Sequence, residues 1–221
     1  MLSIVSTPIG NLEDITLRAL RILKEADFIA CEDTRVTGQL LKFYEIENSG
    51  RLMSFHSHSG FSKIDKVIDL LHEGKHVALV SDAGTPGISD PGFILIKKAI
   101  EANLTVEPIP GASAVLSALV ASGFDTHQYI YLGFLPIKKG RQTMLKKLQN
   151  REYTTIVYES VHRIEKTLSE FEEYFGSETP LVVAREITKK FEEFTRGTIS
   201  EVRSFFKENP GKIKGEFVII F

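Results

Sequence analysis

The chain has few of the residues that stabilise small extracellular domains or soft-metal sites: its 221 residues include one cysteine, Cys31, and no tryptophan. One cysteine excludes a disulfide scaffold and a cysteine-rich zinc site, and it suits a reducing compartment. No apolar run approaches the roughly 20 residues that cross a bilayer. Residues 1–10 also lack the basic segment and long apolar stretch of a secretory signal. These absences predict a cytoplasmic protein with no membrane partner.

The chain also has no large excess of positive or negative charge. The net charge is −2, which excludes a globally basic nucleic-acid-binding protein but leaves room for a local basic patch. Hydrophobic residues make up 43% and charged residues 25% of the chain, so disordered, collagen-like and coiled-coil classes are excluded. The length fits one large domain or two of about 110 residues.

The first half alternates apolar, β-branched runs with helical patterns. The predicted strands are residues 2–6, 28–31, 52–55, 77–80 and 105–109. The predicted helices between them are residues 15–25, 38–44, 63–73 and 93–102. Such alternation favours a parallel sheet covered by helices on both faces, with ligand sites beyond the carboxyl ends of its strands.

The second half mixes the same elements less regularly. The predicted helices are residues 112–122, 141–150, 162–175 and 199–207, and the predicted strands are residues 129–134, 154–158, 181–185, 193–197 and 216–221. The chain is therefore expected to form two α/β domains. The first, 1–111, has a parallel sheet, the second, 112–221, has a mixed sheet, and a ligand cleft lies between them.

The segment 81–92, SDAGTPGISDPG, directly follows a buried-type strand. Its three glycines and two prolines make a rigid loop whose backbone can approach a ligand closely, with Asp82 placed to accept hydrogen bonds from it. The alternative is a tight structural turn followed by a helix cap at Ser89 or Asp90. The segment is neither a P-loop nor a dinucleotide-binding glycine motif.

Other polar groups follow the second and third predicted strands. Glu32, Asp33 and Arg35 are costly at a strand end unless they are paired. They indicate either a functional loop or a helix start with capping acids and a salt bridge. His56 and His58 share one strand face, but no third ligand follows at a convincing spacing, so we predict no metal.

One segment is densely basic. It contains Lys138, Lys139 and Arg141, followed by further lysines and Arg151. It is either a solvated helix face or a contact to a nucleic-acid backbone. For the second reading, Lys138, Lys139 and Arg141 are the candidate RNA-binding residues.

Eight stretches in this order carry a family resemblance: STPIGNLEDIT, CEDTRVTGQLL, VSDAGTPGISDPG, PIPGASA, YLGFLPIKKGR, VYESVHR, AREITKKFEEFTRG and KGEFVII. They resemble the tetrapyrrole methylase superfamily of class III S-adenosylmethionine methyltransferases, and within it the ribosomal RNA small subunit methyltransferase I family. The resemblance implies two α/β domains with S-adenosylmethionine in the cleft between them. It also implies a homodimer that acts in ribosome biogenesis and 2′-O-methylates a decoding-centre cytidine, with 16S rRNA or the small ribosomal subunit as its partner.

The resemblance also implies roles for single residues. The cofactor-binding residues would be Pro8, Asp82, Ala83, Gly84, Thr85, Ala112, Ser113, Tyr158, Ala184 and Gly215. The catalytic candidates on the substrate side would be Glu32, Asp33, Arg35, Glu159 and Glu186, with Arg185 beside them. Two positions depart from the family pattern: Ser59 stands where an asparagine is usual, and Val161 where a proline is usual.

Two other functions stay open at this point. One is methylation of a ring carbon of a tetrapyrrole on the same fold. The other is a cofactor-binding module that assists ribosome assembly without turnover. Methyl transfer to a 2′-hydroxyl needs the reacting atoms held in line and an acceptor near the hydroxyl proton, and it needs no metal.

Overall fold

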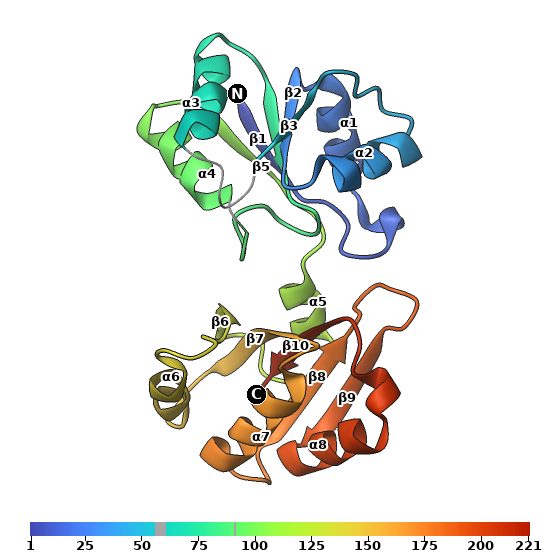
Figure 1. Ribbon diagram of the computed structural model, residues 1–221, viewed down its shortest axis with the longest axis vertical. Coiled ribbons are helices and arrows are strands. Elements are labelled where there is room, and N and C mark those ends of the chain that lie inside the picture. Colours follow the sequence, from blue (N-terminus) through green and yellow to red (C-terminus); the bar gives the residue numbers. More distant parts are fainter. Residues whose placement is uncertain (56–60, 91) are drawn as a thin grey trace. The chain divides into compact units, whose positions relative to one another are not determined.

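The computed structural model describes residues 1–55, 61–90 and 92–221. The chain divides into two compact units, Met1–Ser113 and Ala114–Phe221, each of which contains a five-stranded sheet (Figure 1). The predicted α/β fold with two sheets is confirmed.

The sheet of the first unit is parallel in every pairing that the structure describes, in the strand order β3-β2-β4-β1-β5. Its strands are β1 (Leu2–Val5), β2 (Phe28–Cys31), β3 (Leu52–Ser54), β4 (Val77–Val80) and β5 (Val106–Ile109). Each agrees with its predicted bounds to within one residue. Such agreement is expected because these short apolar runs are bounded by turn residues.

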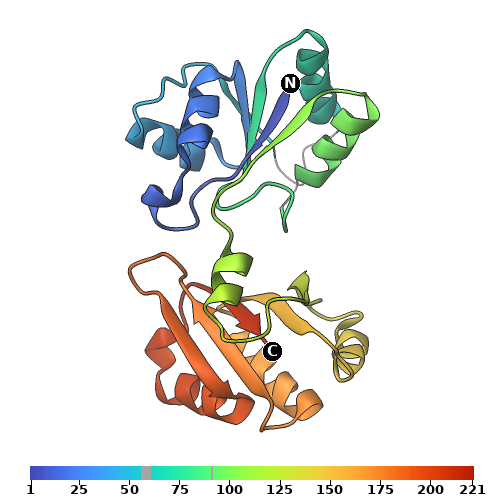
Figure 2. The ribbon, with the colours of Figure 1, turned by 180° about the vertical axis from the view of Figure 1, so that it is seen from behind.

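Helices cover both faces of this sheet, as Figures 1 and 2 show. They are α1 (Leu17–Glu25) and α2 (Thr34–Phe43) on one face, and α3 (Phe61–His72) and α4 (Gly92–Glu101) on the other. Because side chains alternate along a strand, Ile29 and Cys31 pack in the cluster that includes α1 and α2, while Ala30 packs in the cluster that includes α3 and α4. Both faces are therefore buried, as a parallel sheet requires.

Helix α2 begins at Thr34, four residues before the predicted start at residue 38. Asp33 is its N-cap, and the Asp33 carboxylate accepts the backbone N–H of Arg35 at 2.8 Å. Of the two alternatives predicted for Glu32–Arg35, the structure shows the helix start with a capping acid and a salt bridge. The helix tolerates Gly38 because the cap satisfies an N–H that would otherwise lack a partner in the first turn.

The sheet of the second unit is mixed, in the order β6-β7-β10-β8-β9. Its strands are β6 (Tyr129–Phe134), β7 (Thr154–Ser160), β8 (Pro180–Arg185), β9 (Glu193–Thr198) and β10 (Glu216–Ile220). β6 and β7 run parallel, joined by α6 (Arg141–Leu148), and the other described pairs are antiparallel. The predicted mixed sheet is confirmed.

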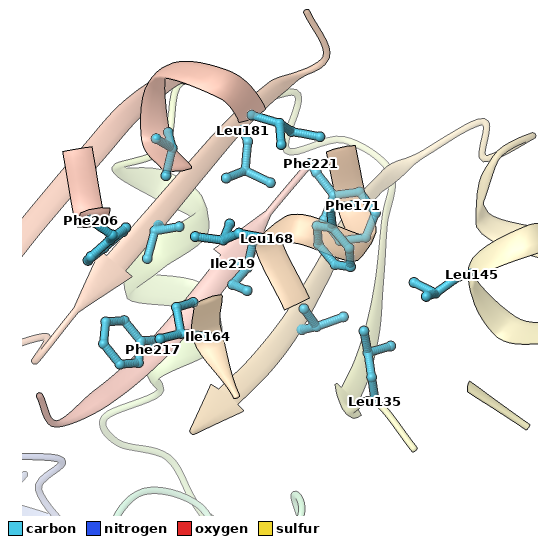
Figure 3. Close-up of a cluster of buried hydrophobic side chains, with 14 residues drawn as sticks. Leu135, Leu145, Ile164, Leu168, Phe171, Leu181, Phe206, Phe217, Ile219 and Phe221 are labelled. Atoms are coloured by element: carbon cyan, nitrogen blue, oxygen red, sulfur yellow. The ribbon is translucent and has the colours of Figure 1, made fainter. Parts of the chain in front are cut away.

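One face of this sheet packs on α7 (Ile164–Phe175) and α8 (Ile199–Glu208). The core between them is mainly aliphatic and also contains the rings of Phe171, Phe206 and Phe217, each at most 1% exposed (Figure 3). The short helix α5 (Ala114–Val120) contacts β10 and lies on the other side of the sheet in Figures 1 and 2. Most strand residues on that face are buried, including Ile156, Ala184 and Val218, whereas Tyr158 is partly exposed.

A first prediction concerns Gly111, which follows β5 where the chain passes β1. A Cβ at this residue would lie 2.7 Å from the Ser6 Cβ and 3.3 Å from the Ser6 carbonyl oxygen. Gly111→Ala should therefore force the strand ends apart and lower the free energy of unfolding by about 1–3 kcal/mol. Urea unfolding followed by circular dichroism measures this loss.

The matched control is Gly211→Ala, because no atom lies within 4 Å of a Cβ at that position. Its unfolding midpoint should stay near that of the parent chain. Equal midpoints for the two variants would contradict the close approach at Gly111.

Candidate functional site

Three loops meet at the carboxyl end of the first sheet. Thr7 and Gly84 exchange backbone hydrogen bonds of 2.9 and 3.1 Å. Gly84 has φ +84, and a Cβ there would lie 3.4 Å from Ile9 and 3.8 Å from the Ala112 carbonyl oxygen. The loops that carry Pro8, Gly84 and Ala112 are thus brought into contact distance, and the positive φ of Gly84 favours glycine there.

Buried hydroxyls hold these loops in place. The Ser6 and Thr85 hydroxyl oxygens are 2.8 Å apart, and the Thr7 hydroxyl donates to the Ser81 carbonyl oxygen at 3.1 Å. The Ser81 hydroxyl donates to the Gly84 carbonyl oxygen at 3.1 Å. Thr85 was expected to bind the cofactor, whereas no role was predicted for Ser6, Thr7 or Ser81. The available signal was their position directly after two strands that turn out to be neighbours, β1 and β4.

Asp82 links this cluster to the loop after β2. Its carboxylate accepts the backbone N–H of Asp33 at 3.0 Å, although the residue itself is exposed. β2 and β4 are adjacent in the sheet, so their carboxyl ends are neighbours. Asp82 therefore combines an anchoring role with a carboxylate that a ligand can reach.

Asp90 fixes the second half of the same loop. Its Oδ1 accepts the backbone N–H of Gly87 at 2.5 Å and that of Gly92, the first residue of α4, at 3.0 Å. Gly87 has φ +88, a conformation that favours glycine. Asp90, one of the two residues expected to cap this helix, thus binds its first N–H group.

Asp33 and Arg35 form an ion pair at the start of α2. The Arg35 Nη2 lies 2.6 Å from the Asp33 Oδ2, and Arg35 Nε also donates to that carboxylate. Hydrogen bonds from the Arg35 side chain and backbone lower the pKa of Asp33 to about 2. Asp33 is consequently a weak proton acceptor at neutral pH. The Arg35 side chain is 86% exposed and held in a fixed orientation, which suits an anionic ligand.

In the second unit, two of the expected cofactor residues lie in one row across the sheet. Tyr158 is opposite Val218, which is opposite Ala184. The Tyr131 and Phe134 rings contact Tyr158, with centroids 5.2 and 5.6 Å away. Burial and the neighbouring Tyr131 raise the pKa of Tyr158 well above its usual range. Its hydroxyl therefore stays protonated at neutral pH.

Glu186 and Gly215 also lie together. Glu186 has φ +52, and its carboxylate accepts Lys189 Nζ at 2.9 Å and the backbone N–H of Glu216 at 3.1 Å. Any Cβ at residue 215 would overlap that carboxylate, so the position requires glycine. Burial raises the pKa of Glu186, but the Lys189 and Glu216 hydrogen bonds outweigh it and leave the pKa below its usual value. Glu186 is therefore a poor base.

Glu159 does not occupy the position expected of a catalytic group. Its side chain is 0% exposed, and its carboxylate accepts the Thr167 hydroxyl at 2.6 Å and lies 2.8 Å from Arg163 Nε. Adjacent strand residues point to opposite faces, so Glu159 points toward α7 and away from the face of Tyr158. The expectation of a catalytic role is wrong, because the carboxylate is sealed in the helix-covered layer.

Arg141 is likewise misassigned as an RNA contact. It is 4% exposed, and its guanidinium donates to Glu170 at 2.7 Å, to the Thr167 hydroxyl at 2.7 Å and to the Pro136 carbonyl oxygen at 3.1 Å. Lys138 and Lys139 are exposed, as expected. The sequence alone does not distinguish Arg141 from Lys138 and Lys139. Arg141, however, is the first residue of α6 and its side chain points inward.

Within the described residues there is no group of three or more histidine, cysteine, aspartate or glutamate side chains that could hold a metal ion. His56, His58 and Ser59 lie outside the described residues. No helix in the described parts of the chain is long and apolar enough to span a bilayer.

Relatives of known identity align with the whole chain. A profile of the tetrapyrrole (corrin/porphyrin) methylases matches residues 1–203. The ribosomal RNA small subunit methyltransferase I of Pasteurella multocida is 46% identical over 221 residues, covering 100% of this chain and 78% of that protein. The protein of that name from Halalkalibacterium halodurans is 47% identical over 220 residues, covering 99% of this chain and 74% of that protein.

Solved structures share the fold at lower identity. Cobalt precorrin-4 methyltransferase, a cobalamin biosynthetic enzyme, has a TM-score of 0.70 at 20% identity and covers 99% of this chain and 93% of its own. Uroporphyrin-III C-methyl transferase from Thermus thermophilus, complexed with S-adenyl homocysteine, has a TM-score of 0.65 at 18% identity and covers 99% of this chain and 96% of its own. The chain therefore belongs to the tetrapyrrole methylase family and, within it, to the ribosomal RNA small subunit methyltransferase I family.

Proposed function

We propose that this chain transfers a methyl group from S-adenosylmethionine to the 2′-oxygen of a cytidine in 16S ribosomal RNA. The observation that carries the activity is whole-length similarity, at 46% identity, to a protein named as a small-subunit ribosomal RNA methyltransferase. The convergence of the loops at Pro8, Gly84 and Ala112 supports it, since such a cradle at the carboxyl end of a parallel sheet is where ligands bind. The cytidine and its 2′-oxygen come from the family resemblance.

The first unit fits the cofactor. Gly84, with φ +84, lets the backbone turn at this point, and the absence of a side chain lets a ligand approach the backbone closely. Asp82 supplies a negatively charged acceptor, and the backbone from Ala83 to Thr85 supplies further polar groups. We assign Ser113 to the same cradle and, from the family resemblance, a cofactor-binding role to Tyr158, Ala184 and Gly215. The bound cofactor would supply a methyl group on a positively charged sulfur.

The carboxylates differ in their fitness to accept the 2′-hydroxyl proton. Asp33 is held ionised by Arg35, Glu159 is buried, and Glu186 is paired with Lys189. Glu32 is partly exposed and directly follows β2, at the edge where ligands of parallel sheets bind, which favours it as the acceptor. We assign the acceptor role to Glu32 and a phosphate contact to Arg35, whose guanidinium cannot act as a base at neutral pH.

Two alternative functions remain as rivals to this proposal, and two properties of the chain stay predictions. The precorrin and uroporphyrin enzymes resemble this chain at 18–20% identity, which concerns the fold and does not favour a tetrapyrrole substrate. A module without turnover is the other rival. The homodimer and the cytoplasmic location stay predictions from the family resemblance and from the composition.

The function is tested by incubating the chain with methyl-labelled S-adenosylmethionine and, separately, naked 16S rRNA, assembled small subunits and a corrin precursor. We expect label in RNA, recovered as 2′-O-methylcytidine after digestion. Label in the corrin precursor would establish the first rival. Cofactor binding without label in any substrate would favour the second.

Asp82 should contribute to cofactor affinity. Asp82→Ala removes both the anchor for the Asp33 N–H and an acceptor for the ligand, so we expect a loss of about 1.5–3 kcal/mol in the free energy of S-adenosylmethionine binding. Isothermal titration calorimetry measures it.

Asp82→Asn separates the two contributions, because it keeps an oxygen for the Asp33 N–H and removes the charge. A smaller loss is expected in this variant. An unchanged dissociation constant in the folded alanine variant would exclude Asp82 from the cofactor site.

Glu32 should control the chemical step. Base catalysis typically contributes about 10²–10⁴-fold, so Glu32→Gln should lower the single-turnover rate by a factor in this range while cofactor affinity stays constant. Glu165→Gln, on the first turn of α7, is the control and should leave the rate unchanged. A parental rate in Glu32→Gln would exclude Glu32 as the acceptor.

A further inference from the structure

Phe134, the last residue of β6, is unusually exposed for a large apolar side chain in a sheet. It is 52% exposed, whereas the next residue, Leu135, is 2% exposed. The Phe134 ring is supported on its inner sides, by Tyr158 at 5.6 Å and by the Arg163 guanidinium at 5.8 Å. The ring is therefore held in place while about half of its surface remains open to a ligand.

A β-bulge produces this arrangement. Tyr131 pairs with Ile156 and Phe134 with Tyr158, so three steps along β6 match two along β7. Gly133, with φ +63, lies within the irregular stretch. Without the extra residue, alternation would place Phe134 on the face opposite Tyr131. Bulges re-aim side chains in this way, often next to functional sites.

The loop after Phe134 is fixed by two arginines and carries two exposed lysines. Arg163 Nη1 donates to the Leu135 carbonyl oxygen at 3.0 Å, and Arg141 Nη1 donates to the Pro136 carbonyl oxygen at 3.1 Å. Lys138 and Lys139 follow, and within the described part of the chain neither forms an ion pair. Two positive charges are thereby presented within five residues of the open aromatic ring.

Exposed aromatic rings beside positive charges are how proteins bind single-stranded nucleic acid, since every base has a face that can stack and every nucleotide has a phosphate. We propose that Phe134, Lys138 and Lys139 form a binding site for a single-stranded segment of the RNA substrate, with one base stacked on the Phe134 ring and phosphates held by the lysines. The proposal rests on RNA being the substrate, and it adds a nucleotide-binding site in the second unit.

The ring and the lysines should leave different signatures in RNA binding. Phe134→Leu keeps an apolar side chain but removes the aromatic face, so affinity should fall about 10-fold with an unchanged salt dependence. Replacing both Lys138 and Lys139 with alanine should also weaken binding. It should reduce the slope of log affinity against log salt by about 0.7 for each phosphate that the protein no longer neutralises.

The measurement is fluorescence anisotropy with a labelled single-stranded RNA that carries the substrate cytidine, at several salt concentrations. Phe134→Tyr should bind as the parent chain does, because it keeps the ring. The control is Phe43→Leu: Phe43 is 62% exposed and also contacts a tyrosine ring, that of Tyr44, but it ends α2 in the first unit. It should bind RNA as the parent does.

Several outcomes would overturn the site. These are parental affinity in a folded Phe134→Leu variant, equal losses in Phe134→Leu and Phe43→Leu, or a parent chain that does not bind this RNA. A loss of S-adenosylmethionine affinity in Phe134→Leu, measured by calorimetry, would instead place the ring in the cofactor site. If the parent binds the RNA through Phe134 but transfers no methyl group, the proposed activity fails while the binding site stands.

Discussion

The two backbone hydrogen bonds between Thr7 and Gly84 are the constraint on which the first unit's candidate site depends. They join the loops after β1 and β4, two strands that are adjacent in the sheet. Asp82, two residues before Gly84, then holds the loop after β2 through the Asp33 N–H. These hydrogen bonds thus fix the relative positions of the loops after β1, β2 and β4, and with them the charged residues that the loops carry.

The second unit uses buried charge for the same purpose. Glu159, Arg163 and Arg141 are all engaged beneath the sheet, through Thr167, Glu170 and the carbonyl oxygens of the loop after β6. A buried ion pair contributes little net stability on average, but loss of one partner is costly. These groups therefore serve mainly to fix one conformation of the loop that carries Lys138 and Lys139.

The hydrophobic periodicity of the sequence was sufficient to predict the strands. Each apolar run has the length of a strand and can be buried along that whole length. The periodicity did not predict the features that depend on the hydrogen bonds of a single side chain. Asp33 starts α2 four residues early through one hydrogen bond, and Arg141 turns inward because Glu170 and Thr167 accept its hydrogen bonds there. The row of Tyr158 and Ala184 depends on strand register, and the position of Phe134 on one extra residue in β6. The sequence does not show which strands become neighbours, and Gly133 within the β6 run is only an indirect signal of a bulge.

The place of β1 at the inside of its sheet has a consequence for synthesis on the ribosome. Leu2 pairs with Val77 on one side and with Val106 on the other, so the first strand to emerge is completed only after the last strand of its unit has been made. Until then Leu2, Ile4 and Val5, all buried in the native fold, lack at least one of their two partner strands. Contacts this distant in sequence slow folding and prolong exposure of apolar strands. The pairing of β1 is thus expected to be completed late in the folding of its unit.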